Sequence, residues 1–562
     1  MRDGFAVGTD EPREERAAGR ALRLGGAGRG LSAFAKVVGA IQWRGYDPAV
    51  DAAQWYLTAG ERGNVSTSLD SRHDDGAAWT AGNLVRPLIH GASYFLELHE
   101  RVARMGDGDV ILFVDWRGDP DEELTGQPGS AVGAVLAAAA GRGVDVRGLV
   151  WRSHWDRIAF SASENRHLGE QINARGGEVV LDMRVRLGGS HHQKFVVLRH
   201  PKQPGRDVAF LGGIDLCHSR RDDIGHHGDR QRQAMAKVYG PTPPWHDVQL
   251  AIEGPAVGDV ETVFRERWQD PQLLSRSPFR ALQDRRRRDR PARSPLPPQL
   301  PDPPIAGPHP VQILRTYPRR VGGYPFAPHG ERSVARAYIK AIGQARHLIY
   351  LEDQYLWSKE VAAVFAAALT RNLDLRLIAV LPPFPDQDGR LSEPPNLVSR
   401  QALLGMLDRA APGRVAAYGL ENSAGTPIYV HSKVCVIDDQ WASVGSDNFN
   451  RRSWTHDSEA SAAVAHAGFA RTLREQLAQE HLAAETGMAI PLADQFRLFA
   501  ESAARLEAWR ARGRPGPRPP GQLRPLASTP VRPTTRALAT AAYRAVYDPD
   551  GRPLALRLRR SF

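Results

Sequence analysis

Two short stretches decide the fold of this chain: GGSHHQKFVVLRH at residues 188–200 and IYVHSKVCVIDD at residues 428–439. In each stretch a histidine and a lysine stand two residues apart, and four apolar residues follow the lysine. Side chains two residues apart lie on the same side of an extended chain, so each stretch presents an imidazole and an ammonium together at the start of a strand. One such pair is expected by chance, but two copies in matching surroundings indicate a shared function.

The sequence around the two stretches repeats in the same order. The first half contains the strand-like DVILFVDW at residues 109–116, and the second contains HLIYLEDQYLW at residues 347–357. Each is followed by an alanine-rich helical stretch and a second apolar strand before the His-x-Lys pair is reached. Strands that alternate with helices predict an α/β fold, and the repeated order predicts two similar domains, each with a β-sheet flanked by helices.

Composition divides the chain into five segments. Arginine and proline dominate residues 284–310, which we expect to form a linker because such a segment can neither hold a helix nor bury a core. We expect a mobile arm at residues 1–38, the first repeat at residues 39–283, the second repeat at residues 311–505 and a basic, proline- and arginine-rich tail at residues 506–562.

The net charge of +11 is concentrated near the C-terminal end. Residues 510–562 contain twelve Arg, no Lys and two Asp, which amounts to +10 and leaves the rest of the chain close to neutral. The tail can attract anionic membranes or polyanions, but a near-neutral body is not typical of a nucleic-acid-binding protein. No apolar run reaches the roughly 20 residues of a membrane span and no signal peptide is recognised, so we expect a cytoplasmic protein, at most peripheral to a membrane.

A glycine-led turn follows each His-x-Lys strand. The turn comprises residues 212–215 (GGID) in the first half and residues 445–448 (GSDN) in the second. Beyond each turn an acidic residue stands close to a histidine, in the segments WHD, which ends at Asp247, and THDSE, which ends at Glu459. The two halves therefore share not only a strand pattern but also the order of their polar residues.

These features resemble the phospholipase D superfamily. HSKVCVIDDQWASVGSDNFNRRS, which begins at residue 431, resembles the HxKxxxxD signature and its GSxNxxxRS extension, and the segments GGIDL and WHD resemble the amino-terminal repeat of the phospholipase D enzymes proper. The resemblance covers roughly residues 45–280 and 311–490. It implies two domains, each with a mixed β-sheet flanked by helices, which are related by a pseudo-two-fold axis and share one active site at their interface.

The resemblance also implies chemical roles. A phosphodiester is negatively charged and repels nucleophiles, so Lys194 and Lys433 are expected to hold its non-bridging oxygens, with Asn448 as a further donor. His192 is implied as the nucleophile that forms a phosphohistidine, and His431 as the acid and base that serves the leaving and entering groups. From the residues alone the two histidines could exchange these roles.

Each histidine ring needs a hydrogen-bonding partner on its second nitrogen, which fixes its tautomer and orientation. By likeness to the family we expect Asp247 to hold His192 and Glu459 to hold His431. The residues expected to support the site structurally are Asp438, Gly213, Asp215 and Ser446.

The two motif strands end differently. The second ends at Asp438, which has the opposite side-chain parity to His431 and Lys433 and should therefore face away from the reaction centre, toward the backbone of neighbouring loops. The first ends at Arg199, which a hairpin-like insertion follows. We interpret Arg199 as a change in the scaffold, with Asp207 at the far end of the hairpin as a replacement for the missing aspartate.

No cofactor and no metal is needed in this scheme, because the lysines neutralise the charge. The chain contains no HExxH and no pair of CxxC motifs, and the adjacent His226 and His227 are expected at the surface. The two cysteines, Cys217 and Cys435, are expected to be reduced and to fill small apolar spaces beside the site.

The leading interpretation is a phospholipase D-like phosphodiesterase that acts on a glycerophospholipid as a monomer, with water or an alcohol as acceptor. One alternative is a phosphatidyltransferase of the cardiolipin-synthase type, although such enzymes are usually anchored in a membrane. A second is a nuclease of the same superfamily, but nucleic acid is not expected as a partner because the positive charge lies in the tail. A third is a non-catalytic adaptor, which two intact His-x-Lys pairs argue against.

Overall fold

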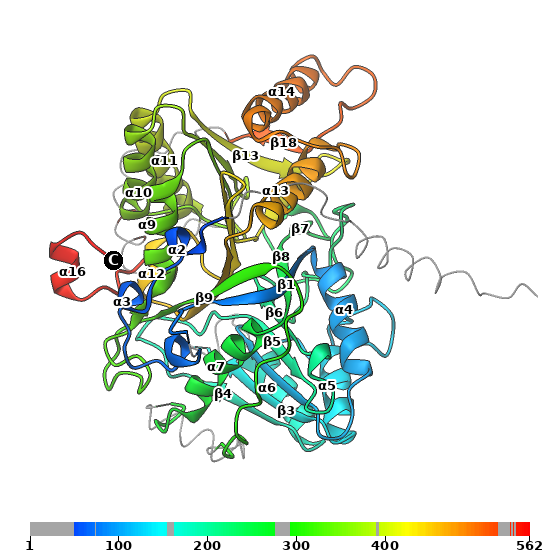
Figure 1. Cartoon of the computed structure of the whole chain (residues 1–562). Helices are drawn as coiled ribbons and strands as arrows, with labels where there is room; N and C mark the ends of the chain where they lie inside the picture. Colours follow the sequence, from blue (N-terminus) through cyan, green and yellow to red (C-terminus); the bar gives the residue numbers. More distant parts are fainter. Residues whose placement is uncertain are drawn as a thin grey trace, which may run out of the picture. The chain divides into compact units, whose positions relative to one another are not determined.

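Two β-sheets with the same order of strands form the centre of the protein (Figure 1). The computed structural model describes residues 50–73, 75–153, 162–275, 293–388, 393–526, 540, 543 and 547–562. These residues belong to a unit that extends from Ala49 to Phe562. The predicted arm at residues 1–38 lies outside the described residues.

The first sheet has the spatial order β4-β3-β2-β5-β6-β8-β1. Its strands β2, β3 and β4 are parallel, and the other neighbours are antiparallel, so the sheet is mixed as predicted. The strands are β1 (Thr80–Ile89), β2 (Val110–Asp115), β3 (Asp145–Trp151), β4 (Glu178–Asp182), β5 (Phe195–Arg199), β6 (Val208–Gly212) and β8 (Val248–Glu253).

The second sheet repeats this arrangement as β13-β12-β11-β15-β16-β17-β9, again with three parallel strands followed by antiparallel ones. Three short strands extend it: β10 pairs with β9, and β14 and β18 pair with β13. The strands are β9 (His309–Tyr317), β10 (Glu331–Arg332), β11 (Leu348–Glu352), β12 (Arg376–Val380), β13 (Val415–Glu421), β14 (Pro427–Val430), β15 (Val434–Ile437), β16 (Trp441–Gly445), β17 (Glu459–Val464) and β18 (Leu523–Pro525).

Two strand pairings join the sheets. Strand β1 runs antiparallel to β9 at the matching edge of each sheet, which is the arrangement that a two-fold relation between the repeats requires. The short strand β7 (Trp245–His246) of the first repeat runs parallel to β14 of the second. The expected α/β fold with two similar domains is therefore confirmed, and the motif strands β5 and β15 occupy the same position in the two sheets.

Helices cover the outer faces of both sheets and pack between their inner faces. Leucines, valines and phenylalanines of α4, α5 and α6 form one core with the first sheet, and those of α9, α10 and α11 form another with the second. Helices α7 and α13 share a central core with the inner faces of both sheets. The bounds are α4 (Gly91–Ala103), α5 (Val132–Gly141), α6 (Ala162–Asn173), α7 (Ala256–Gln269), α9 (Ser333–Gln344), α10 (Lys359–Arg371), α11 (Glu393–Ala410) and α13 (Ala467–Leu482).

Parts of the predicted linker and tail belong to the folded body. In the linker, the carbonyls of Pro297 and Pro301 accept hydrogen bonds from Arg265 (2.7 Å) and Arg199 (2.5 Å). In the tail, β18 adds to the second sheet, and arginines on and near α14 (Leu492–Ala511) surround the carboxylate of Glu421. Further short elements are α2 (Ala52–Trp55), α3 (Ala59–Arg62), α12 (Arg451–Thr455) and α16 (Leu554–Leu558).

Among the described residues no helix combines the length and the apolar character that crossing a membrane requires.

Candidate active site

Two backbone contacts between the repeats bring each motif histidine to the other half of the molecule. The N–H of His431 donates to the carbonyl of His246 (2.8 Å), as part of the parallel pairing of β14 with β7. The N–H of His192 donates to the carbonyl of Ser458 (2.9 Å). In both cases the accepting residue stands immediately before the acidic residue of its repeat.

The acidic residues consequently pair with the histidines of the opposite repeats. The Nδ1 atom of His192 lies 2.9 Å from Oε2 of Glu459, and Nδ1 of His431 lies 2.6 Å from Oδ2 of Asp247. The predicted partners, Asp247 for His192 and Glu459 for His431, are therefore wrong. The physical reason is the backbone pairing between the repeats, which places each acid beside the histidine of the other half.

The ring of His192 is partly exposed and that of His431 is almost buried, while both acids are fully buried. The side chains of His192 and His431 are 15% and 6% exposed, whereas those of Glu459 and Asp247 are fully buried. Because Nδ1 of each ring is occupied by its acid, Nε2 is the atom left to react. The site thus offers two imidazole nitrogens, each fixed in orientation by a buried carboxyl group.

The two lysines lie beside the histidines as predicted. The Lys194 ammonium donates to the carbonyl of His192 (2.9 Å) and lies 3.4 Å from Oδ1 of Asp215. The Lys433 ammonium donates to the carbonyl of His431. Burial lowers the pKa of Lys433 to about 8, so part of its charge is lost slightly above neutral pH.

Electrostatics shows that the two motifs form one centre. Burial lowers the pKa of His192 well below its usual value, and both Lys194 and Lys433 lower it further. Burial also lowers the pKa of His431, again with help from both lysines. Burial raises the pKa of Glu459 to about 8 and also raises that of Asp247. Burial therefore disfavours charge on each acid–histidine pair.

The glycine-led turns make room for the acids. A Cβ atom on Gly213 would lie 2.1 Å from Oδ1 of Asp247, so only glycine lets this carboxylate approach His431. The corresponding residue of the second repeat, Ser446, donates its hydroxyl to Oε2 of Glu459 (2.5 Å). Both residues were predicted as structural support, and each lies against the acid of one histidine.

The last residues of the two turns differ in charge. Asp215 lies between Lys194 and Arg220, and their charges offset the effect of burial on its carboxylate. Asn448 is buried, and its Oδ1 has no hydrogen-bond partner among the described residues. A buried amide oxygen without a partner is suited to bind a polar group of a substrate.

The two ends of the motif strands behave as the sequence predicts. Asp438 accepts hydrogen bonds from three successive backbone N–H groups, those of residues 346–348, with distances of 2.6 to 2.8 Å. Arg199 is buried and forms ion pairs with Asp207 (2.8 Å) and Glu261. Asp207 in turn accepts the backbone N–H of His200 (2.5 Å), so it takes over a backbone contact at this strand end.

Sequence reasoning missed the aromatic and amide side chains beside the lysines. The ring of Trp116 lies 5.9 Å from the Lys194 ammonium, and Oε1 of Gln354 lies 3.5 Å from that of Lys433. Each residue follows an aspartate at the end of one of the matching strands, Asp115 as the last residue of β2 and Asp353 directly after β11, and that repeated position was the available signal. The ring of Trp245 also lies 4.9 Å from that of His431.

The cysteines and the histidine pair complete the comparison with the sequence. Cys217 and Cys435 are reduced and buried, and burial raises the pKa of both thiols, as expected of small apolar fillers. His227 is exposed as predicted, but His226 is fully buried, so its predicted surface position is wrong. Nε2 of His226 lies 2.9 Å from Oε1 of the buried carboxylate of Glu480.

Family models match both halves of the chain. One described as phospholipase D matches residues 109–289, and one described as cardiolipin synthase, PLD-like domain, matches residues 338–481. The chain belongs to the phospholipase D superfamily.

Similar proteins come from plants. Phospholipase D alpha 1 of Cynara cardunculus is 26% identical over 453 residues, which cover 60% of this chain and 55% of that protein. Phospholipase D alpha 2 of Oryza sativa subsp. japonica is 26% identical over 452 residues, which cover 58% of this chain and 53% of that protein. The chain thus spans about half the length of the curated relatives it matches. Among solved structures, phosphatidylserine synthase of Haemophilus influenzae Rd KW20 matches with a TM-score of 0.47 and 12% identity, over 76% of this chain and 95% of that one.

Proposed function

We propose that the protein cleaves the phosphodiester bond of a glycerophospholipid in two steps through a phosphohistidine. The observation that carries this proposal is the pair of imidazoles, each held at Nδ1 by a carboxyl group of the opposite repeat, with two lysines beside them. One imidazole can attack phosphorus while the other transfers a proton, which divides a difficult displacement into two easier ones.

In the first step Nε2 of His192 forms a bond to phosphorus, and the bond from phosphorus to the head-group oxygen breaks. His431, protonated and paired with Asp247, gives its Nε2 proton to that oxygen, which leaves as an alcohol. Lys194 and Lys433 bind the non-bridging oxygens. The choice of His192 as nucleophile rests on the family resemblance, since the geometry of the two rings is closely matched.

In the second step neutral His431 removes a proton from water or from an acceptor alcohol, whose oxygen attacks phosphorus. The bond between phosphorus and His192 breaks, and the free imidazole returns. Water yields phosphatidic acid and an alcohol yields a new phosphatidyl ester. Transfer is the second candidate outcome because the match of residues 338–481 is to a model described as cardiolipin synthase, PLD-like domain.

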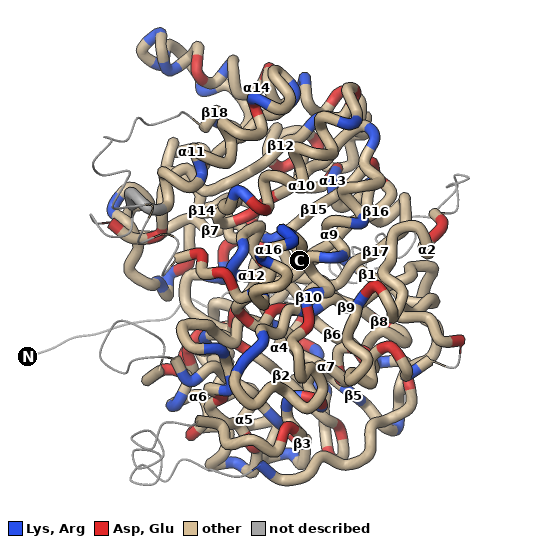
Figure 2. Tube along the Cα trace, turned by 90° about the vertical axis from the view of Figure 1, so that its left-hand side faces the viewer, with Lys and Arg blue, Asp and Glu red and all other residues tan. Residues whose placement is uncertain are grey.

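Two surface features support a lipid over a nucleic acid. Large apolar side chains stand out from two adjacent loops near the first motif: Leu187 is 94% exposed and Val321 is 85% exposed. The loops are joined by a hydrogen bond from Arg186 to the carbonyl of Arg319 (3.0 Å). In the part of the chain that the structure describes, basic and acidic residues are interspersed (Figure 2), whereas a duplex-binding groove would need a basic surface.

The test compares the wild-type protein with His192→Ala and His431→Ala on phosphatidylcholine vesicles that contain ethanol. We expect release of choline and formation of phosphatidylethanol by the wild type, and a loss of at least about 1,000-fold in both variants. The exposed His227 provides the matched control, since His227→Ala should retain full activity.

A labelled oligonucleotide serves as the competing substrate. Cleavage of the oligonucleotide without release of choline would overturn the proposal in favour of a nuclease. An acid-labile phosphatidyl group that accumulates on His192 in the His431→Ala variant would support His192 as the nucleophile. Accumulation of this group on His431 in the His192→Ala variant would reverse the two roles.

A further inference from the structure

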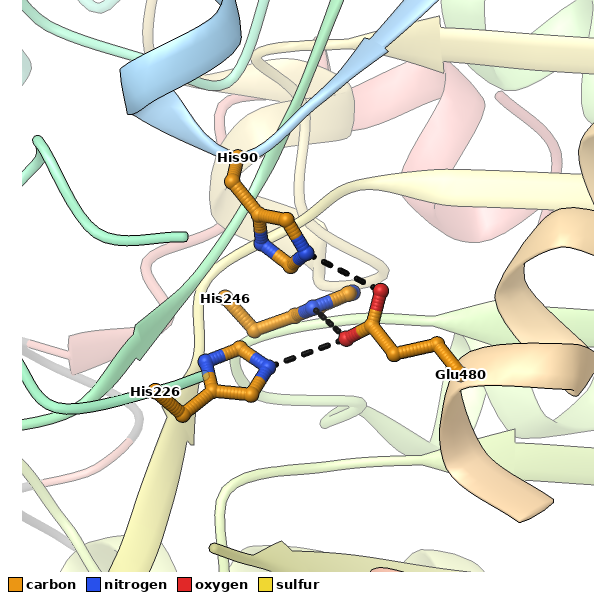
Figure 3. A group of neighbouring side chains, drawn as sticks. All are labelled: His90, His226, His246 and Glu480. Atoms are coloured by element: carbon orange, nitrogen blue, oxygen red, sulfur yellow. Dashed lines mark hydrogen bonds and ion pairs between the residues drawn. The ribbon is translucent and has the colours of Figure 1, made fainter. Parts of the chain in front are cut away.

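A second cluster of histidines lies behind the active site. His90, His226 and His246 of the first repeat converge on the carboxylate of Glu480, which α13 of the second repeat supplies (Figure 3). All four side chains are buried. Their candidate ligand atoms lie within 4.8 Å of one another. The proposed reaction uses none of these groups.

We propose that His90, His226, His246 and Glu480 bind one Zn²⁺ ion that joins the two repeats. Nε2 of His90 lies 3.0 Å and Nε2 of His226 lies 2.9 Å from the carboxylate oxygens of Glu480, and Nδ1 of His246 lies 3.2 Å from one of them. A tetrahedral zinc ion with bonds of about 2.0 to 2.1 Å separates its ligand atoms by about 3.3 Å. Only a small movement of the rings is therefore required.

The nitrogens on the far sides of two rings have the partners that zinc ligands usually have. Nε2 of His246 lies 2.8 Å from Oε2 of Glu352, and Nδ1 of His226 lies 3.6 Å from Oδ2 of Asp222. A carboxylate behind a ligating histidine fixes its tautomer and makes the ring a better donor to the metal. Glu352 is itself held by His481 (2.8 Å) and by the hydroxyl of Tyr350 (2.5 Å).

Charge balance favours a cation at the centre of the cluster. Within the described ranges no Lys or Arg lies within ion-pair distance of Glu480; its recorded partners are the three histidines. A buried carboxylate is costly unless a positive charge compensates it. One Zn²⁺ with three neutral imidazoles balances the charges of Glu480 and Glu352.

The position of the cluster suggests its purpose. His246 directly precedes Asp247, and its carbonyl accepts the N–H of His431. A metal that holds His246 would therefore fix the backbone that carries the acid–histidine pair of the active site. It would also connect the end of β1 and the strand β7 of the first repeat to α13 of the second, so the ion would act as a structural clamp rather than as a reactant.

The experiment measures zinc in the full-length protein, purified without a polyhistidine tag and separated from excess Zn²⁺ by gel filtration. We expect about one zinc per chain in the wild type and in His227→Gln. His226→Gln and Glu480→Gln should lose more zinc affinity than the about 10-fold to 100-fold that is lost when a residue hydrogen-bonded to a metal ligand is removed. His226 and His227 are adjacent, so they form a matched buried and exposed pair.

Two measurements on the wild type keep the test decisive if a variant does not fold. A strong chelator should lower Tm and added Zn²⁺ should restore it, because a ligand that binds only the folded state stabilises it. Co²⁺ in place of zinc should give the intense visible bands of a tetrahedral ion. A wild-type protein that retains no zinc and shows no shift of Tm would overturn the proposal, as would equal zinc contents in the wild type and in folded Glu480→Gln.

Discussion

Oε2 of Glu459 lies 2.9 Å from Nδ1 of His192, although 267 residues separate them along the chain. The reciprocal pair, Asp247 and His431, spans 184 residues. Each repeat thus holds the histidine of the other in its working orientation. The active site is not merely located between the domains; it is constructed from side chains that the domains exchange.

The exchanged pairing predicts which acid controls which histidine. Glu459→Gln should abolish the proton uptake of the His192–Glu459 pair near pH 8, because an amide does not titrate, while Asp247→Asn should leave this uptake nearly unchanged. Nuclear magnetic resonance of ¹⁵N-labelled histidine would measure both. The opposite pattern would restore the pairing expected from the sequence. In either variant kcat should fall by about 100- to 10,000-fold, as the orientation of one ring is lost.

The pH dependence of kcat/KM should be bell-shaped, with its maximum near pH 8. Burial raises the pKa of Glu459 to about 8, so the His192–Glu459 pair keeps an extra proton at lower pH and releases a reactive imidazole only as the pH rises. Burial lowers the pKa of Lys433 to about 8, so this lysine loses the positive charge with which it binds the phosphate as the pH rises further. In Glu459→Gln the rising limb of the kcat/KM profile should move to lower pH. A rising limb at the same pH in the variant and the wild type would show that another group controls it.

Gly213→Ala should reduce activity with a modest effect on stability. The new methyl group would lie 2.1 Å from Oδ1 of Asp247, so the carboxylate must move away from His431. A displacement of about 1 Å at a catalytic group costs about 100-fold in rate, and overpacking costs about 1–3 kcal/mol in the free energy of unfolding. Gly205→Ala is the control, since its Cβ would meet no atom within 4 Å. Equal activity of the two variants would refute this role for Gly213.

Arg199→Asp should destabilise the protein without raising turnover. The guanidinium is buried between Asp207 and Glu261, and the substitution would place three carboxyl groups together. Breaking a buried ion pair in this way costs about 3–5 kcal/mol, which thermal or urea unfolding would measure. Lys202→Asp, in the exposed hairpin that follows, should have little effect. A marked rise in kcat for Arg199→Asp would show instead that Arg199 impairs catalysis.

Leu187→Asp should weaken action on vesicles more than action on a short-chain, monomeric phospholipid. The substitution removes an apolar side chain that is 94% exposed and adds a charge that anionic lipids repel. Leu373→Asp is the matched control, because Leu373 is 75% exposed but lies just before β12, at the opposite end of the parallel strands from the site. Equal losses on both substrates would place Leu187 outside the lipid contact.

The sequence predicted much of the fold because the pattern of strands and helices is local and occurs twice. Contacts that follow from strand geometry were also predictable. Asp438 has the opposite side-chain parity to His431 and Lys433, and its carboxylate accepts backbone N–H groups of a neighbouring loop. Asp207, at the far end of the hairpin, accepts the backbone N–H of His200 at the end of the first motif strand.

The sequence could not predict contacts that depend on how the repeats dock. Likeness to the family suggested that Asp247 belongs to His192, but the parallel pairing of β7 with β14 places it beside His431. The same docking buries His226 against Glu480, a residue 254 positions away. Trp116 and Gln354 were not predicted as site residues, because only the folded structure shows that they lie beside Lys194 and Lys433.

The exchange of acids also bears on the history of the chain. A gene that encoded a single repeat could reach the same geometry only when two copies associated, each lending its acid to the histidine of its partner. In such an ancestor both acids would have been identical. Fusion into one chain freed them to diverge, and here one is aspartate and the other glutamate. Duplication thus allowed the two histidines to acquire different hydrogen-bonding partners.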